Sequence, residues 1–344
     1  MRLLMRQRLT AVFPLGCMVN VALSGSAYAH VKWFCAFDVA GQPRNLANVL
    51  CPDLEFLVGL TILMLLAGAL TEGTRLGVAM ERAMDRVTGF IRDNTEWMYR
   101  AGAAFFFISI WAAGGILLTP ELKTSSVWIG MIQLGIAACV LSRRTMPLSG
   151  IGMATLFAVA IWQYGAFHLA DYPVFIGIAL YFILVGFQRD LFGVHPLGVV
   201  RWSAALTLMW ASIEKWAYPE WSFPLLDKYP GMMLGFDPEF FMRSAGAIEF
   251  ALAFALLLTP LVRRIAATIL SGMFIAAIFQ FGKIDLIGHT MIIVVLLGIV
   301  ADNRDCYSII RRPAFVPVGY VTVLVAYLFV YYAAHAALFG TTIL

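Results

Sequence analysis

The feature that most constrains this chain is a series of ten apolar stretches, each of a length suited to crossing a lipid bilayer. A transmembrane helix needs about 17–25 mostly apolar residues. Charged residues make up 13% of the sequence and hydrophobic residues 61%, against roughly 25% and 45–50% in soluble domains. The sequence therefore predicts an all-α, polytopic membrane protein. The stretches are 54–72, 101–119, 126–142, 149–169, 172–187, 198–217, 243–261, 265–283, 285–301 and 315–338.

The N-terminus has the pattern of a secretory signal peptide, residues 1–29. Basic residues precede an apolar stretch from Leu9 to Leu23, and Ala27-Tyr28-Ala29 forms a small-x-small cleavage site. Cleavage there makes His30 the first residue of the mature chain, followed by an exported segment, 30–53. An uncleaved signal anchor is the alternative. In both cases the exported segment lies outside the cytoplasm.

The basic residues predict how the spans are oriented. They concentrate in alternate connections, which the positive-inside rule places in the cytoplasm. The first span is 54–73 and the last is 314–338, and the ten spans are an even number. Both mature termini are therefore expected on the same side, the periplasm of a bacterial inner membrane. The basic residues in the cytoplasmic connections are Arg75, Arg82, Arg86, Arg92, Arg143, Arg144, Arg189, Arg263, Arg264, Arg304, Arg311 and Arg312.

Residues 74–100 carry a different pattern from the spans. Leu76, Met80, Met84 and Val87 recur at steps of four, four and three among several arginines, which is typical of an amphipathic helix. We expect this helix to lie along the inner membrane surface. A helix that docks a protein is the alternative.

Two parts of the chain nearly repeat each other. AIWQYG at 160–165 matches AIFQFG at 277–282, and WAAGGILLTPEL at 111–122 matches WASIEKWAYPEW at 210–221. Each copy holds four predicted spans, an even number, so both copies enter the membrane from the same side. The sequence predicts two parallel four-helix repeats, 101–187 and 198–301, flanked by one span on either side.

The second copy resembles the DoxX-like family of four-helix membrane proteins over residues 201–301. The resemblance rests on EKWAYP at 214–219, on GAIE at 246–249 opening a Leu/Ala-rich helix, and on TPLVR at 259–263 before a helix rich in small residues. It implies a four-helix bundle and, for the best-known members, a membrane subunit of thiosulfate:quinone oxidoreductase. The first copy departs from the pattern, with Gln133 near the position of Glu249.

Charged residues in the second copy form the candidate site. A charge at the centre of a membrane helix costs roughly 2.5–3.5 kcal/mol, so such residues face the bundle interior and often mark function. Glu249 lies about 9 Å deeper than Arg243 at the rise of an α-helix, and Lys215 or Lys283 is its expected partner. The expected catalytic residues are Glu249, Lys215, His289 and Asp285. The expected substrate-binding residues are Glu214, Lys283, Gln280, Arg243, Trp210 and Trp216.

A purely structural interpretation competes with this site. Glu214, Lys215, Glu249 and Lys283 would then form interhelical ion pairs, with the tryptophans in an aromatic belt at the membrane surface. The first copy has Gly115 and Ile116 in place of Glu214 and Lys215. It is expected to pack without those charges, which argues against a need for them in packing alone.

Several cysteines and histidines lie outside the predicted site. We expect a structural disulfide between Cys35 and Cys51 because the exported compartment is oxidising. His168 and Asp171 are expected as an exposed loop pair, with a second polar patch as the alternative. His335 is expected to be structural. A copper site with His30 and nearby methionines lacks paired histidines to support it, and no metal site is predicted.

Three functions remain open from the sequence. The first is a membrane redox subunit that passes electrons from a small anion such as thiosulfate, or from a periplasmic partner protein, to quinone, with no covalently bound cofactor. The second is a transporter of ions or small molecules, because parallel repeats around charges suit alternating access. The third is a scaffold for a periplasmic partner. The chain lacks the basic, aromatic-interleaved patch of a nucleic-acid-binding protein.

Overall fold

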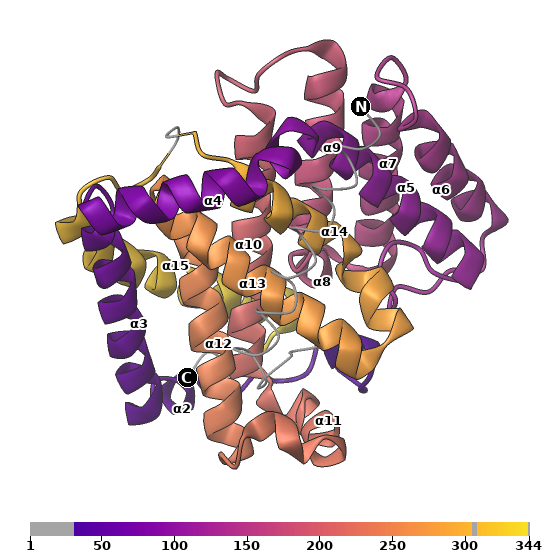
Figure 1. Cartoon of the computed structure of the whole chain (residues 1–344). Coiled ribbons are helices and arrows are strands. Elements are labelled where there is room, and N and C mark those ends of the chain that lie inside the picture. Colours follow the sequence, from indigo (N-terminus) through magenta and orange to yellow (C-terminus); the bar gives the residue numbers. More distant parts are fainter. Residues whose placement is uncertain (1–30, 305–307, 343–344) are drawn as a thin grey trace.

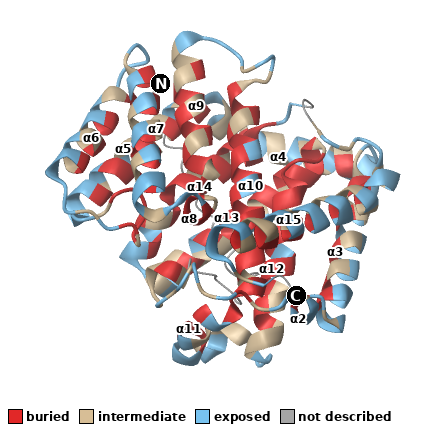
Figure 2. Ribbon diagram, turned by 180° about the vertical axis from the view of Figure 1, so that it is seen from behind, coloured by how far each residue is buried: buried red, intermediate tan, exposed pale blue. Residues whose placement is uncertain are grey.

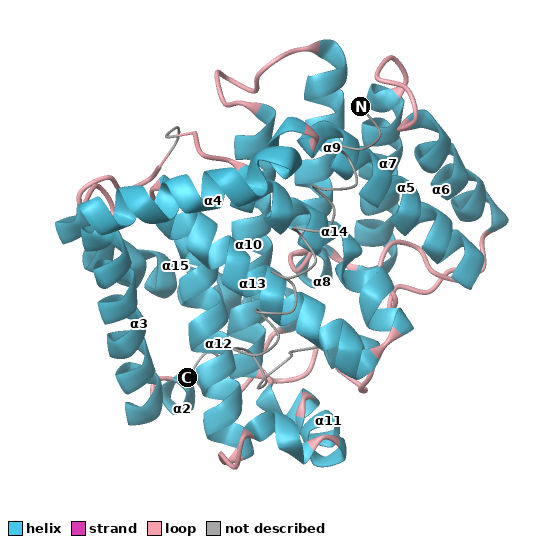
Figure 3. Cartoon of the chain, in the orientation of Figure 1, coloured by secondary structure: helices cyan, strands magenta, loops and turns pink. Residues whose placement is uncertain are grey.

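The computed structural model describes residues 31–304 and 308–342 and shows a bundle of helices (Figure 1). Within these ranges there are 14 α-helices, joined by loops and two isolated bridges (Figure 3). The all-α prediction is therefore confirmed. The predicted signal peptide 1–29 and His30 lie outside the described residues.

A helix lies at each of the ten predicted spans. Several begin with proline in their first turn, where its missing N–H costs no hydrogen bond. These helices are α3 (Pro52–Thr71), α5 (Thr95–Ala113), α6 (Val127–Cys139), α7 (Met146–Tyr164), α9 (Pro173–Phe187), α10 (Pro196–Ala217), α12 (Pro238–Ala255), α13 (Pro260–Phe281), α14 (Lys283–Ala301) and α15 (Val316–Phe339). The shorter elements are η1 (Val31–Trp33), α2 (Leu46–Val49), α8 (Ala166–Leu169), η2 (Pro219–Trp221), α11 (Phe223–Lys228), η3 (Pro230–Met233) and η4 (Pro313–Phe315), and α4 (Arg75–Asp93) is the amphipathic helix.

Five helical segments of the described chain are long and apolar enough to cross a membrane. They are α3, α7, α13, α14 and the segment Pro313–Phe339 that contains α15. Large apolar side chains are also exposed on the bundle surface, among them Phe56 at 65%, Trp128 at 77% and Trp162 at 90%. Exposed apolar surface on this scale indicates contact with lipid, as expected of a multi-pass membrane protein.

The helices pack in two successive groups. In the first, α5, α6, α7 and α9 pack in chain order, and in the second α10, α12, α13 and α14 do the same. The groups meet where α9 packs against α10 and α14 against α5, and α3 and α15 lie against the second group. Buried residues concentrate on α9, α10 and α12 to α14, whereas α3 and α6 expose one side (Figure 2).

The two ends of the bundle differ. At one end, the α4 end, α4 crosses the helix termini, and at the other, the α11 end, the segment before α3 packs near α11 (Figure 1). The arginines Arg263 and Arg264, predicted in a cytoplasmic connection, are instead fully buried in the first turn of α13. Arg264 donates to Val300 O at 2.8 Å and pairs with Asp85 of α4 at 3.0 Å. The two arginines belong to the helix and not to the connection because Pro260 starts α13 before them; their side of the membrane stays a prediction.

Helices α7 and α9 approach closely at Gly150. A Cβ atom there would lie 2.3 Å from the carbonyl oxygen of Ala179, whereas at the exposed Gly135 of α6 it would meet nothing within 4 Å. We expect Gly150→Ala to lower the free energy of unfolding by about 1–3 kcal/mol through overpacking. Thermal unfolding in detergent checks this, with Gly135→Ala as the matched control. Equal midpoints for the two variants would contradict the close approach.

Candidate functional site

The exported segment inserts a lysine into the bundle. Lys32, in η1, has a side chain that is 0% exposed, and its Nζ donates to Asp171 Oδ2 at 2.5 Å and to Glu214 Oε1 at 2.7 Å. The rings of Phe37 and Trp221 lie 5.8 and 5.6 Å from the same Nζ. One ammonium group thus joins η1, the turn before α9, and α10.

The surroundings of Lys32 decide its protonation. Burial by itself would lower the pKa of the ammonium, but the charges of Asp171 and Glu214 and their hydrogen bonds outweigh burial and raise the pKa. Lys32 is therefore a permanent cation here. Two carboxylates share its single positive charge, so the trio has a net charge of −1 when both acids are ionised.

Hydrogen bonds hold the rest of the exported segment on the bundle. Arg44 N donates to Ala217 O at 2.8 Å, and the hydroxyls of Tyr218 and Tyr332 donate to Gly41 O at 2.8 Å and to Arg44 O at 2.7 Å. These bonds satisfy backbone groups that would otherwise be buried without partners. Residues 31–51 therefore form a fitted cover, not a loose tail.

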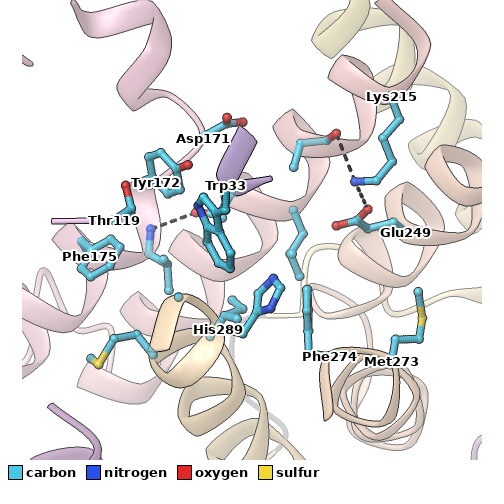
Figure 4. A pocket seen from close by; sticks show the side chains of 17 residues that line it. Trp33, Thr119, Asp171, Tyr172, Phe175, Lys215, Glu249, Met273, Phe274 and His289 are labelled. Carbon is cyan, nitrogen blue, oxygen red and sulfur yellow. Dashed lines mark hydrogen bonds and ion pairs between the residues drawn. The ribbon is translucent and has the colours of Figure 1, made fainter. Parts of the chain in front are cut away.

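A cavity of about 70 Å³ lies beneath this cover. Trp33 lies in the middle of it, with Asp171 and Tyr172 on one side and Lys215 and Glu249 on the other (Figure 4). The volume holds a few water molecules, because one water needs about 10–15 Å³ by this measure. Aromatic, acidic and basic groups thus face one small enclosed space.

The pair Lys215–Glu249 bridges α10 and α12. Lys215 Nζ lies 2.5 Å from Glu249 Oε2, with side chains 18% and 7% exposed. Of the two partners that the sequence suggested for Glu249, the structure brings Lys215 to it. Glu214, one residue earlier, turns to Lys32 instead.

His289 and Asp285 form a second pair, within α14. Nδ1 of His289 lies 3.0 Å from Asp285 Oδ2, and both side chains are buried. The rings of Trp33 and Phe274 lie 4.6 and 4.7 Å from the imidazole, centroid to centroid. In the tautomer in which Nδ1–H donates a hydrogen bond to Asp285 Oδ2, Nε2 is left to exchange a proton with a neighbour.

A third polar group comes from the first helix group. Thr119 donates to Glu121 Oε1 at 2.9 Å, Tyr172 donates to the same oxygen, and His168 Nε2 lies 3.8 Å from it. His168 and Asp171 are 5% and 1% exposed. The expectation of an exposed loop pair was therefore wrong, because α8 folds inward and the exported segment covers both residues.

Several predicted site residues lie away from the cavity. Gln280 and Lys283 are exposed on either side of the α13–α14 turn, where Gly282 adopts φ +76°. Arg243 pairs with Asp53 at 2.9 Å. The α13–α14 turn exposes Gln280 and Lys283, and the ion pair with Asp53 holds Arg243 away from the cavity.

Two predicted tryptophans are packing residues. Trp210 packs against Phe167 and Tyr331 at ring-centroid distances of 5.2 and 4.9 Å. Trp216 Nε1 donates to Arg243 O at 3.1 Å. Neither lines the cavity, and Trp33 and Phe274 supply its aromatic walls instead.

The expected disulfide is not formed. Cys35 and Cys51 are both free thiols, because Cys35 lies against Leu225 of α11 whereas Cys51 immediately precedes α3. Burial raises the pKa of the Cys35 thiol, which keeps it in the protonated form. Hydrogen bonds and the Lys32 ion pairs attach the segment in place of a covalent link.

Histidines outside the cavity have structural partners. His335 of α15 is buried, with Nε2 2.8 Å from both Tyr218 Oη and Val39 O, and Nδ1 2.7 Å from Thr341 Oγ1. In residues 31–304 and 308–342, no three His, Cys, Asp or Glu side chains gather as metal ligands would. His30 lies outside these ranges.

Four residues at or next to the cavity were not predicted from the sequence: Lys32, Trp33, Glu121 and Tyr172. Each lies in a segment outside the predicted spans or at a span's first residues, where polar and aromatic residues are ordinary. One signal was present: His168 and Asp171 follow AIWQYG as Asp285 and His289 follow AIFQFG.

Comparison with known proteins does not assign a family or a function to this site. Neither a family model, nor a curated protein, nor a solved structure matches the chain. The site therefore has to be interpreted from its own chemistry.

Removing the Lys32 ammonium tests the cover directly. We expect Lys32→Met to lower the free energy of unfolding by about 3–5 kcal/mol, because it leaves two buried carboxylates without a counter-ion. Protonation removes their repulsion in the folded variant, so the deficit shrinks as the pH falls and grows as it rises. Thermal unfolding between acidic and mildly alkaline pH measures both effects.

Two further variants control that experiment. Lys283→Met removes an exposed lysine of the same kind and should leave the midpoint unchanged. Lys32→Met combined with Asp171→Asn should recover at least half of the loss. A Lys32→Met protein as stable as the parent would contradict the ion-pair account.

Proposed function

We propose that this chain is an integral membrane protein that binds and exchanges protons at the cavity beneath the exported segment, as the proton-handling part of a quinone-linked redox reaction. The single observation that carries the proposal is the charge balance of the buried groups around this cavity. Among the described residues acidic groups outnumber basic ones, which supports a site that retains protons.

The balance follows from the side chains already described. Two carboxyl groups line the cavity and three more lie next to its lining residues, each at most 8% exposed. In the described part of the chain, ion pairs and close contacts join these five groups to two lysines and two histidines. Among these described groups, the carboxyl groups outnumber the lysines and histidines by one. Burying an excess of negative charge costs several kcal/mol, and we propose that the cluster lowers this cost by holding a proton on one of its carboxyl groups. The five acids are Glu121, Asp171, Glu214, Glu249 and Asp285.

Reduction of a quinone consumes protons as well as electrons, and a proton store beside an aromatic-walled cavity suits that chemistry. His289, fixed at Nδ1 by Asp285, is the proposed group that passes protons at Nε2. Glu249, with Lys215 beside it, is the proposed reservoir. Electrons would come from a small anion such as thiosulfate or from a partner protein, as the DoxX-like resemblance implies.

The size of the cavity sets a condition on this reaction. Its volume is about 70 Å³, and an apolar cavity of about 150 Å³ is known to accept benzene. A quinone head group therefore enters only after Trp33 moves aside. Trp33 belongs to η1 and not to a long helix, so its displacement needs no rearrangement of the bundle.

The membrane orientation is part of the same proposal. Arginines concentrate at the α4 end, which we therefore assign to the cytoplasm, and the cavity then opens toward the periplasm. We also propose that the two helix groups are parallel repeats. Supporting this, Gly165 and Gly282 end the matching hexapeptides and both adopt positive φ, at +86° and +76°.

Proton-coupled transport is the second candidate, and a specific observation favours it. A second cavity of about 40 Å³ lies toward α11, and Ala211 and Lys215 line both cavities. Two small cavities that share a lysine suit the passage of a proton or small ion better than the entry of a ring. Activity without any electron donor would distinguish this function.

Reconstitution into liposomes that enclose a pH-sensitive dye tests both candidates. Quinone reduction with thiosulfate would support the redox proposal, and proton flux driven by a potassium gradient without donor would support transport. We expect His289→Gln and Glu249→Gln to lower the supported activity by about 100-fold or more, the usual weight of a proton-transfer group. Lys283→Gln, an exposed control, should change it less than about twofold.

The outcomes separate clearly. If the folded protein shows neither activity in lipid, with the quinone and the donor both varied, the proposed function is wrong. If activity appears but survives both substitutions, the cavity is not its site.

A further inference from the structure

Helix α4 runs across one end of the bundle (Figure 1). It follows α3 through a turn at Gly73, where φ is +79°, and Thr74 caps it by accepting from Gly77 N at 3.1 Å. It ends at Asp93, directly before α5. Because α3 and α5 both reach the α4 end, the helix between them runs across that end (Figure 1).

The face of α4 that contacts the bundle is mostly polar, and Met84 is an apolar residue on it that packs against the core. Arg264 of α13 pairs with Asp85 at 3.0 Å and donates to Thr88 Oγ1 at 3.2 Å. Gly77 and Thr88 are the buried residues of the helix. The usual arrangement, in which an amphipathic helix turns its apolar face to the protein, is thus not the one found here.

The apolar face of α4 is exposed instead. Leu76, Val87 and Phe90 are 64%, 42% and 50% exposed, and Ala79 and Ala83 between them are also exposed. These positions follow one another at steps of three and four, which aligns them in a single stripe. An exposed apolar stripe on a helix that runs across the end of a bundle of spans is suited to the boundary between lipid head groups and acyl chains.

Arginines border that stripe along one edge. Arg75, Arg82 and Arg86 each precede a stripe residue and are exposed. In the part of the chain that the structure describes, no ion pair joins these three guanidinium groups to an acidic side chain. Guanidinium groups bind phosphate oxygens through paired, charge-assisted hydrogen bonds.

We propose that α4 is a binding site for the head groups of anionic phospholipids. The stripe from Leu76 to Phe90 sinks into the acyl boundary, and Arg75, Arg82 and Arg86 bind lipid phosphates at its edge. Charge complementarity and the continuity of α4 with two spans identify lipid as the occupant. The inference does not depend on the chemistry of the cavity, so each can fail separately.

Lipid retention measures the charge part of the proposal. The full chain is purified in mild detergent with mixed phosphatidylcholine and phosphatidylglycerol, and the bound lipids are counted by native mass spectrometry. We expect the combined variant Arg75→Gln, Arg82→Gln, Arg86→Gln to retain several-fold less phosphatidylglycerol, with phosphatidylcholine unchanged. Arg311→Gln with Arg312→Gln, exposed arginines at the same end, is the matched control and should retain the parental amount.

A depth measurement tests the stripe and stays informative if the triple variant fails to fold. Spin labels are placed at Val87→Cys and, separately, at Arg86→Cys, with the native cysteines replaced, in phosphatidylglycerol-containing bilayers. We expect the Val87 label to collide with oxygen and the Arg86 label with an aqueous nickel chelate. A Val87 label that meets the nickel chelate equally would overturn the proposal and indicate a protein partner for the stripe. Equal phosphatidylglycerol loss in the control would overturn it as well.

Discussion

The ammonium group of Lys32 between Asp171 and Glu214 is the interaction on which the rest of the site depends. It is buried completely, and it links the exported segment to both helix groups. Once Lys32 is in place, Trp33 lies against Gly288, where a Cβ atom would be 2.1 Å from the indole ring. The cover, the small volume of the cavity and the aromatic contact with His289 all follow from this placement.

The two positions that the predicted repeat aligns have different contacts. In the first, Gln133 is buried and its amide donates to Ile116 O at 2.7 Å and to Leu117 O at 3.1 Å, which fixes a loop. In the second, Glu249 pairs with Lys215 at one side of the cavity. A neutral amide satisfies the backbone and needs no counter-ion, whereas the acid and lysine maintain a charged site that packing alone does not require.

The positions of the helices could be predicted from the sequence because apolar length is a local property. The Glu249–Lys215 and Asp285–His289 pairs could be anticipated because charges within apolar helices turn inward. The insertion of Lys32 could not, since a lysine in a polar exported segment carries no periodic signal and its partners are more than a hundred residues away. The burial of Arg264 could not be predicted for a similar reason, because its partner Asp85 lies on a helix distant in the sequence.

Infrared spectroscopy of the protein in lipid, which resolves the carbonyl stretch of a protonated carboxylic acid, tests the central claim most directly. The buried charge balance predicts such a band at neutral pH, because the acids outnumber the basic groups around the cavity. The band should weaken or shift in Glu249→Gln or Asp171→Asn and stay unchanged in a variant of an exposed acid such as Glu55→Gln. A spectrum with every carboxyl group ionised at neutral pH would contradict the account.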